Sequence, residues 1–419
     1  MRITILVLGS QGDVQPLVTL GAALQARGHH VRVATFAAFA PMVTGAGLEH
    51  FTLRGDAHAL VQAAGGDLLS GHQNVLQSMR ALQRSLFPLL EGFTVDLSDP
   101  VLRDTELLLN QLPGDLFSAD LAEYLGIPHA MVAVMPMVRT GRWPMPAFPA
   151  WPARWLPGYS ALTYRLAEML MWQAFRGAVN HWRTGTLGLK AVGFWGPYAA
   201  QYRAGVPNLL GFSAHVVERP SDWGSHIHLT GWWFPDDAPW EPPAGLQRFL
   251  EAGPAPVFIG FGSMTVKDPS ALTALVVQAV RQAGVRAILH RGWAGLGGPE
   301  MPPEIYALDY APYGWLFPRM AGVVHHGGSG TSGYGFRSGL PSFIVPFIFD
   351  QFFWGSRAAA LGVGLRPVSI RALTADNLAA ALVHLAADAA LRECAAALGA
   401  KLQAENGVQH AAGLVERLR

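Results

Sequence analysis

Short apolar runs alternate with amphipathic stretches along most of the chain. Residues 3–8 form the first run; after a loop and a helix expected from about residue 17 to 27, residues 30–35 form the next strand. A run that is apolar at nearly every position is typical of a parallel strand buried on both faces. The opening therefore predicts a βαβ unit of the kind that begins a doubly wound sheet.

The same alternation recurs further along the chain. It predicts strands at 106–110, 129–134, 257–261, 287–290, 323–325 and 343–346, with a helix at 116–125. The segment 235–243 is rich in proline, which blocks regular structure, and it predicts a linker. The expected fold class is α/β, with two Rossmann-like domains that face each other across a cleft. The domains are 1–234 and 244–419, and the last helix is in a position to pack back on the first domain.

Composition and charge narrow the class of protein. The chain has 419 residues, 51% hydrophobic and 14% charged, which suits two globular domains rather than a disordered chain. A formal net charge of +1 argues against nucleic acid as a partner. One cysteine, Cys394, excludes an intrachain disulfide and fits a reducing compartment. Without a secretory signal or an apolar run of about 18–20 residues, we expect a cytoplasmic protein, peripheral to membranes at most.

The most informative stretch is residues 325–331, His-His-Gly-Gly-Ser-Gly-Thr, between a predicted strand and a helical pattern. Glycines let backbone N–H groups approach an anion, and a helix N-terminus adds partial positive charge. Downstream, Asp350 and Gln351 follow the next strand. An acid beside an amide at the carboxyl edge of a parallel sheet suits hydrogen bonding to vicinal sugar hydroxyls.

These motifs carry a family resemblance. Residues 322–364 resemble the donor-binding region of the GT-B-fold family 1 glycosyltransferases, and most of all the branch with sterol glucosyltransferases and glycopeptide-antibiotic glycosyltransferases. The run 9–16 (Gly-Ser-Gln-Gly-Asp-Val-Gln-Pro) is similar to that branch's N-terminal motif, and 261–264 (Phe-Gly-Ser-Met) to its opening of the second domain. The motifs stand in family order and cover both domains.

The resemblance implies a role for each matching residue. Asp13 is implied as the catalytic base, and Tyr310 or its neighbours lie where the family packs the nucleobase. Asp350 and Gln351 are implied to hold the transferred sugar. The residues implied to hold the donor diphosphate are His326, Gly328, Gly330, Thr331 and Ser263. No cofactor and no metal ion are expected.

The chain departs from the family pattern at two positions. Gln11 stands where an arginine is common in this branch. Tyr334 stands where plant relatives carry a glutamate that holds the ribose hydroxyls, so ribose recognition must come from elsewhere. The identity of the nucleotide, a uridine or thymidine diphosphate, is therefore open.

Several motifs also have plainer interpretations. Asp13 could serve only as a helix cap, which is common for aspartate. The run 9–12 could be a nicotinamide-cofactor loop, but it lacks the third glycine, and the second strand ends without an acid to hold a ribose. Asp236 and Asp237 could bind a metal, but they lie in the proline-rich segment with no further ligand at suitable spacing, so a solvated turn is favoured.

Aromatic and methionine side chains crowd between residues 131 and 195. Such residues are usually core, but they also suit a pocket for a bulky apolar acceptor, for which Met135, Trp143 and Trp172 are the candidates. Three arginines, 165, 176 and 183, fall on one face of the predicted helix within 162–183. A solvated edge and a contact with anionic lipid headgroups both remain open.

Together these features predict an inverting, metal-independent glycosyltransferase. It would move a sugar from a nucleotide-diphosphate donor to a hydroxyl of an apolar acceptor such as a sterol, polyketide or lipid. The alternatives are a nucleotide-sugar epimerase on the same fold and a non-catalytic protein that binds lipids or nucleotide sugars.

Overall fold

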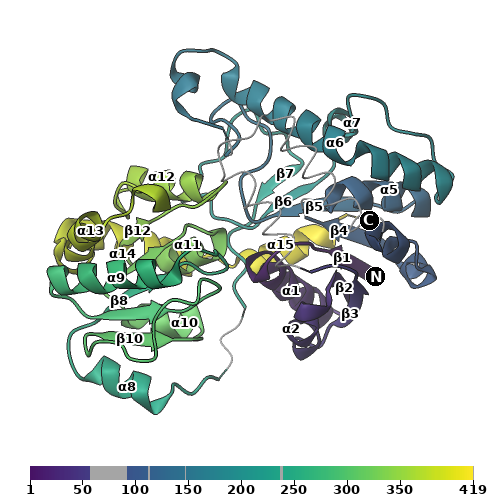
Figure 1. Cartoon of the computed structure of the whole chain (residues 1–419). Helices are drawn as coiled ribbons and strands as arrows, with labels where there is room; N and C mark the ends of the chain where they lie inside the picture. The colour runs from purple at the N-terminus through teal and green to yellow at the C-terminus, as the bar shows by residue number, and fades with distance from the viewer. Residues whose placement is uncertain (57–91, 112–113, 147, 236–238, 419) are drawn as a thin grey trace. The chain divides into compact units, whose positions relative to one another are not determined.

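The computed structural model describes residues 1–56, 92–111, 114–146, 148–235 and 239–418, which form two compact units (Figure 1). The first unit comprises Met1–Phe212, Arg219–Pro235 and Asn406–Arg419, and the second comprises Ser213–Glu218 and Asp236–Glu405. Each unit is built on its own parallel sheet.

Among its described residues, the first unit has a sheet of seven strands in the order β3-β2-β1-β4-β5-β6-β7, all paired in parallel. The strands are β1 (Arg2–Leu6), β2 (His30–Phe36), β3 (Glu49–Leu53), β4 (Leu107–Asn110), β5 (His129–Ala133), β6 (Asn208–Leu210) and β7 (Ile227–Leu229). The helices in the described ranges are α1 (Gln11–Ala26), α2 (Ala40–Gly45), α5 (Asp115–Leu125), α6 (Tyr159–Gly185), α7 (Tyr198–Ala204) and α15 (Gly407–Val415), with 3-10 turns at Ala37–Phe39, Pro100–Asp104 and Trp151–Arg154.

Helix α1 begins six residues earlier than the sequence suggested. Its N-cap is Ser10, and the Asp13 side chain accepts a hydrogen bond from the Ser10 backbone N–H at 2.8 Å. With this reciprocal capping arrangement the helix begins at Gln11, and it continues past Pro16, which lies inside it. The prediction of a loop up to residue 16 was therefore wrong, because it weighted Gly12 and Pro16 above the cap that precedes them.

The second unit contains five parallel strands in the order β10-β9-β8-β11-β12. These are β8 (Val257–Gly260), β9 (Ala287–His290), β10 (Ile305–Leu308), β11 (Gly322–His325) and β12 (Ser342–Ile344). The helices are α8 (Ala244–Glu251), α9 (Pro269–Ala283), α10 (Tyr313–Leu316), α11 (Ser329–Arg337), α12 (Gln351–Ala360), α13 (Ala375–Ala387) and α14 (Ala389–Gln403), with 3-10 turns at Phe317–Arg319 and Ile370–Ala372.

Both faces of the second sheet are buried, as its apolar strands predict. On β8, Val257 and Ile259 pack in a cluster with residues of α9 and α13, whereas Phe258 packs in a different cluster with residues of α8 and α10. Successive side chains of a strand point to opposite faces, so helices cover both sides of this sheet.

The end of the chain belongs to the first unit. Helix α15 contributes Ala411, Ala412 and Val415 to that unit's core, and Glu416 just beyond it forms an ion pair with Arg27 at 2.8 Å. None of the helices in the described ranges is long and apolar enough to cross a membrane.

Helix α6 corrects one expectation about its arginines. Arg183 is buried, and its guanidinium pairs with Asp120 and Glu123 of α5. A buried guanidinium between two carboxylates holds two helices together and cannot face lipid headgroups. Arg183 was therefore placed wrongly on a solvated face with Arg165 and Arg176.

Candidate functional site

The predicted donor residues lie along the carboxyl edge of the second sheet. Because all five strands are parallel, the segments that follow them emerge at the same edge. Ser263 follows β8, His326 follows β11, and Asp350 follows β12. Tyr310 follows β10, the opposite outer strand, and its side chain is 61% exposed.

The His326 ring is enclosed by two glycines. A Cβ added at Gly262 would lie 2.7 Å from its Cε1, and one added at Gly328 would lie 2.5 Å from its Nε2. Gly262 also has a φ of +59°, which favours glycine. Side chains at either position would collide with the imidazole, so the glycines of both motifs make room for this ring.

The electrostatics of His326 follow from its burial. Desolvation lowers its pKa to about 4, so the imidazole is neutral near pH 7. Its Nδ1 is buried and has no hydrogen-bond partner among the described residues. The neighbouring His325 is also buried, with a pKa lowered to about 3, and its Nδ1 accepts from the Gly327 N–H at 3.1 Å.

The start of α11 adds backbone donors beside this ring. The first bond of the helical ladder runs from Ser332 N–H to Gly328 O at 2.9 Å, so the N–H groups of Gly330 and Thr331 precede it. A Cβ added at Gly330 would meet nothing within 4 Å. Thr331 is half-buried, and its hydroxyl lies beside the Tyr313 phenol. This arrangement suits an anion with several oxygens.

Asp350 and Gln351 sit at the start of α12 and differ in what they contact. Asp350 is half-buried and its Oδ2 accepts from the Trp354 indole N–H at 3.0 Å. Gln351 is buried, and its Oε1 accepts from the backbone N–H groups of Phe347 at 2.7 Å and Ile348 at 3.1 Å. The Gln351 side chain thus shapes the loop that presents Asp350. That both bind a sugar stays a prediction.

The residue before Asp350 is in an unusual conformation. Phe349 has a φ of +46°, the only positive φ of a non-glycine residue in the described part of the chain. This left-handed conformation costs roughly 1 kcal/mol or more for a bulky residue and persists only where the surroundings impose it. The Gln351 hydrogen bonds to the two preceding residues are such a constraint.

In the first unit, Asp13 lies between the ends of β1 and β4. Its Oδ2 accepts from the backbone N–H and hydroxyl of Ser10, and its Oδ1 accepts from Gln111 Nε2 at 2.9 Å. Desolvation raises the pKa of Asp13, and the hydrogen bonds from Ser10 and Gln111 partly oppose that rise. Capping and proton acceptance are compatible here, because the carboxylate caps α1 from a position beside the sheet edge.

Sequence reasoning missed a polar cluster at the same edge of the first sheet. Asn110 is fully buried at the end of β4, and its side-chain amide has no partner among the described residues. Asp115 starts α5, and burial raises the pKa of its carboxyl to about 7, with the Tyr198 hydroxyl beside it. A polar residue that ends an apolar strand, as Asn110 does, was the available signal.

The three residues assigned to the acceptor pocket do not share one environment. Met135 follows β5 and is half-buried, and Trp143 packs edge-to-face on Trp223 with ring centroids 6.2 Å apart. Trp172 is fully buried in the core of the first unit, and its indole N–H donates to Gly193 O at 2.9 Å. For Trp172 the structure favours the core interpretation that the sequence left open.

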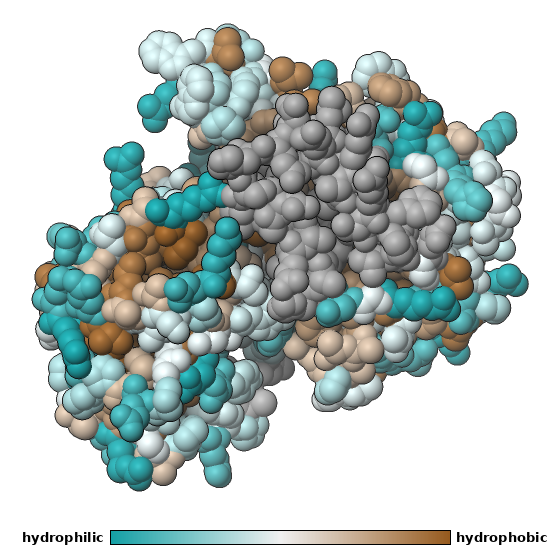
Figure 2. Space-filling view, in the orientation of Figure 1, coloured by the Kyte–Doolittle hydropathy of each residue, from teal (hydrophilic) through white to brown (hydrophobic). Residues whose placement is uncertain are grey.

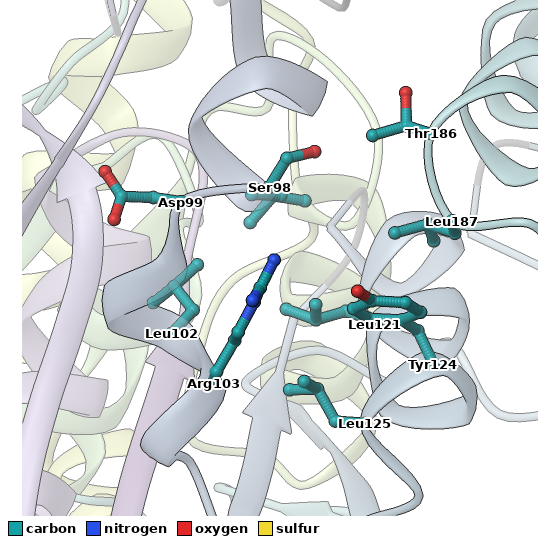
Figure 3. Close-up of a pocket in the computed structure, with 10 residues that line it drawn as sticks. Ser98, Asp99, Leu102, Arg103, Leu121, Tyr124, Leu125, Thr186 and Leu187 are labelled. Carbon is teal, nitrogen blue, oxygen red and sulfur yellow. The ribbon is translucent and has the colours of Figure 1, made fainter.

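A small pocket in the first unit involves none of the predicted residues (Figure 3). It is lined by Leu97, Ser98, Asp99, Leu102, Arg103, Leu121, Tyr124, Leu125, Thr186 and Leu187. Its volume of about 60 Å³ is far below the roughly 300–1,000 Å³ that is typical of small-molecule sites. It is therefore not a candidate for the acceptor site.

Two family domains match the chain, one near each end. Residues 3–98 match the glycosyltransferase family 28 N-terminal domain, and residues 284–418 match the erythromycin biosynthesis protein CIII-like C-terminal domain. The first match contains Asp13, and the second contains His326 and Asp350.

Curated relatives cover almost the whole chain. A sterol 3-beta-glucosyltransferase of Cryptococcus neoformans is 37% identical over all of this chain, which spans 27% of that protein's length. A sterol 3-beta-glucosyltransferase of Arabidopsis thaliana is 35% identical over 97% of this chain, which spans 64% of that protein. The chain thus corresponds to part of these longer relatives. They confirm the resemblance to the sterol glucosyltransferase branch.

Solved structures of similar shape are glycosyltransferases. The glycotransferase of kitacinnamycin aligns over 100% of this chain and 98% of its own, with a TM-score of 0.70 and 23% identity. The calicheamicin glycosyltransferase CalG4 aligns over the same shares, with a TM-score of 0.68 and 17% identity. VinC, solved in complex with DTDP, covers 100% and 99% with a TM-score of 0.63 and 19% identity. At these identities the likeness shows the fold.

Proposed function

We propose that this chain, which has the GT-B fold and carries a glycosyltransferase family 28 N-terminal domain, moves a sugar from a nucleotide diphosphate to a hydroxyl of an apolar acceptor. The acceptor class rests on its sterol 3-beta-glucosyltransferase relatives and on the half-buried Met135 and Trp143 of the first unit.

One observation carries the proposal: the order of the candidate residues along the second sheet. Tyr310 follows β10, Ser263 follows β8, His326 follows β11 and Asp350 follows β12, while the strand order is β10-β9-β8-β11-β12. Four strand spacings of about 4.8 Å span about 19 Å. An aromatic surface, an anion site and a carboxylate in that order match the base, diphosphate and sugar of an extended donor.

The chemistry we propose is direct displacement at the anomeric carbon. The acceptor oxygen attacks opposite the leaving nucleotide diphosphate, which inverts the configuration, and Asp13 accepts the hydroxyl proton. The burial that raises the pKa of Asp13 makes its carboxylate a better proton acceptor than an exposed aspartate. Transfer requires the acceptor oxygen at Asp13 to reach the sugar that the second unit holds.

Departure of the diphosphate is assisted by neutral donors. The His326 imidazole and the N–H groups of Gly330 and Thr331 can each donate to phosphate oxygens as negative charge develops there. Because burial keeps His326 neutral near pH 7, it acts as a dipolar donor and not as a cation. We propose that these groups fill the role that a metal ion has in other transferases.

The experiment that tests this function is a nucleotide-diphosphate release assay. With uridine or thymidine diphosphate-glucose, we expect release that depends on an added sterol, together with a glycosylated product in the mass spectrum. An epimerase would release nucleotide or convert the donor without an acceptor, and a binding protein would do neither. Either result would contradict the proposal.

A further inference from the structure

Large apolar side chains are exposed in one part of the first unit. Among the described residues, half of the exposed large hydrophobic side chains lie between residues 151 and 195. They are Trp151, Trp155, Leu156, Leu162, Leu166, Met171, Phe194 and Trp195. Trp155 and Trp195 are 79% and 76% exposed, which is unusual for the largest apolar side chain. A concentration of this kind marks an interaction surface.

Of these side chains, Leu162 and Leu166 lie on one face of α6, and Trp155 lies four residues before the helix begins. Leu162 and Leu166 are one turn apart, and Gln173 and Asn180 continue the same face at 100° per residue. Gln173 donates to Phe194 O at 2.6 Å, and Asn180 donates to Val192 O at 3.0 Å. These bonds hold the 192–195 segment on that face. We call Trp155, Leu162, Leu166, Phe194 and Trp195 the α6 strip.

The opposite face of α6 explains why the strip is not core. Trp172, Phe175, Val179 and Trp182 point inward and belong to the core of the first unit. Helix α6 lies at the rim of this unit in Figure 1. In Figure 2 the projection at the top of the same view is mostly white and pale teal, with a few brown side chains and strongly teal ones at its margin.

Most charged residues in the segment that contains the α6 strip are basic. Residues 131–200 contain seven basic residues and one acid, in a chain whose formal net charge is only +1. Two of the seven, Arg139 and Arg183, are used in internal ion pairs with Glu168, Asp120 and Glu123. Arg154, Arg165 and Lys190 are exposed. The Arg176 guanidinium lies 5.8 Å from the Phe194 ring centroid.

We propose that the α6 strip docks this unit on an anionic membrane surface. Indole rings favour the boundary between headgroups and hydrocarbon, and arginine and lysine side chains beside them attract anionic headgroups. Residues 131–200 contain no acid other than Glu168. A protein partner with a basic surface would therefore find almost no opposite charge here, which disfavours such a partner. The inference does not depend on the transfer reaction, because it uses none of the proposed donor or catalytic residues.

The test is co-sedimentation of the full chain with vesicles. Phosphatidylcholine vesicles and vesicles of phosphatidylcholine with phosphatidylserine are compared at low and high salt. We expect binding to the anionic vesicles that weakens as salt screens the headgroup charge. The double variant Arg154→Gln/Arg165→Gln should weaken vesicle binding about tenfold or more, since each basic side chain near the membrane surface contributes about 1 kcal/mol. Arg392→Gln, at an exposed position on α14, is the matched control.

The apolar part of the surface is tested separately. The double variant Trp155→Ser/Leu162→Ser should weaken vesicle binding at least about tenfold. The single variant Trp195→Ser should also weaken vesicle binding. Val383→Ser, which removes an exposed apolar side chain from α13, should leave it unchanged. Unchanged melting temperatures show that the variants fold.

Three results would overturn the inference. If the wild-type protein stays in the supernatant with anionic vesicles, it has no surface that binds membranes. Binding that persists in both the arginine and the tryptophan variants uses another part of the chain. Light scattering gives the third result. If the wild-type protein is a dimer and the double variant Trp155→Ser/Leu162→Ser is a monomer, the α6 strip binds a second copy of the chain and not a membrane.

Discussion

A neutral histidine, His326, is the residue on which we expect donor binding to depend most. His326 is enclosed by Gly262 and Gly328, which leaves the ring little freedom to turn. Burial lowers its pKa to about 4, so one ring nitrogen carries a proton and can donate across the working pH range. A fixed neutral donor loses little entropy when it meets a phosphate oxygen.

His326→Ala should therefore weaken nucleotide-diphosphate binding. A hydrogen bond to a charged group contributes about 1.5–3 kcal/mol, so the dissociation constant should rise by one to two orders of magnitude in titration calorimetry. His384→Ala, at an exposed position on α13, is the control. Unchanged affinity in the His326 variant would remove this residue from the donor site.

Gln111 offers a way to test the proposed base without removing it. Its side-chain N–H donates to Asp13 Oδ1 at 2.9 Å, which favours the charged carboxylate. Gln111→Leu should raise the pKa of Asp13, so the acidic limb of kcat/KM should move to higher pH. Asp13→Asn should slow transfer by about 10²–10⁴-fold.

Gln247→Leu, an exposed glutamine on α8, should leave the pH profile in place. If Gln111→Leu lowers activity equally at every pH, then Gln111 has only a structural role. If Asp13→Asn keeps near-normal turnover, then Asp13 is only a cap.

At the scale of elements, the strands are where sequence and structure agree best. Each strand expected from an apolar run is present within about two residues, because burial on both faces leaves a strong signal. The strands that were missed include β6 and β7, whose three residues are too few for periodicity to detect. The polar β3 was missed for lack of an apolar run.

Side-chain environments were harder to predict than strands. Trp172 and Trp155 belong to the same aromatic stretch, yet one is fully buried and the other is largely exposed. Arg183 shares a helical face with Arg165, and only the approach of α5 with Asp120 decides that it is buried. Such differences depend on which element packs against which, and the local sequence does not contain that information.

Substitutions of the neighbours Asp350 and Gln351, at the start of α12, should have different effects. Gln351→Ala leaves the N–H groups of Phe347 and Ile348 without their acceptor, so it should lower the free energy of unfolding by about 1–3 kcal/mol. Gln351→Glu keeps an acceptor oxygen and should be milder. Asp350→Ala should instead reduce turnover with the intact donor and leave binding of the bare nucleotide diphosphate unchanged.

Denaturant unfolding and calorimetry measure the two effects. If Gln351→Ala is as stable as wild type, the loop does not depend on this amide. If Asp350→Ala keeps wild-type turnover, the sugar is held elsewhere.

At the scale of the whole molecule, the two units provide different parts of the proposed reaction. The candidate base belongs to the first unit and the candidate donor residues to the second. The sequence predicted two α/β domains because its strand pattern starts again after the proline-rich segment. It could not show that Ser213–Glu218 belongs to the second unit, since that depends on contacts such as the one between Arg357 and Val216 O at 2.8 Å.

A chelator should leave the transfer activity intact if the leaving group is stabilised as proposed. The donors there are an imidazole and backbone N–H groups, which need no metal ion to act. Initial rates of nucleotide-diphosphate release with and without EDTA check this. Loss of activity that magnesium or manganese restores would contradict the proposed leaving-group chemistry.

The pH dependence of stability should contain two opposing contributions. The buried histidines 325 and 326 have pKa values lowered to about 3 and 4, so the unfolded chain takes up protons there before the native state does. Their contribution to stability is fully present above about pH 6.5 and is lost as the pH falls to about 4 for His326 and about 3 for His325. Asp115 acts in the opposite direction, because burial raises the pKa of its carboxyl to about 7.

For Asp115 the native state binds the extra proton, so stability falls as the pH rises from about 4 to 7, and the loss is complete above that range. Asp115→Asn removes the ionisable group and keeps its size. The variant should be more stable than wild type at pH 8, by up to a few kcal/mol, and similar to it at pH 4. Urea unfolding at both pH values measures the difference, with Asp376→Asn at an exposed position as the control. Equal destabilisation of Asp115→Asn at both pH values would mean that the carboxyl of Asp115 is ionised in the native protein and held by its neighbours.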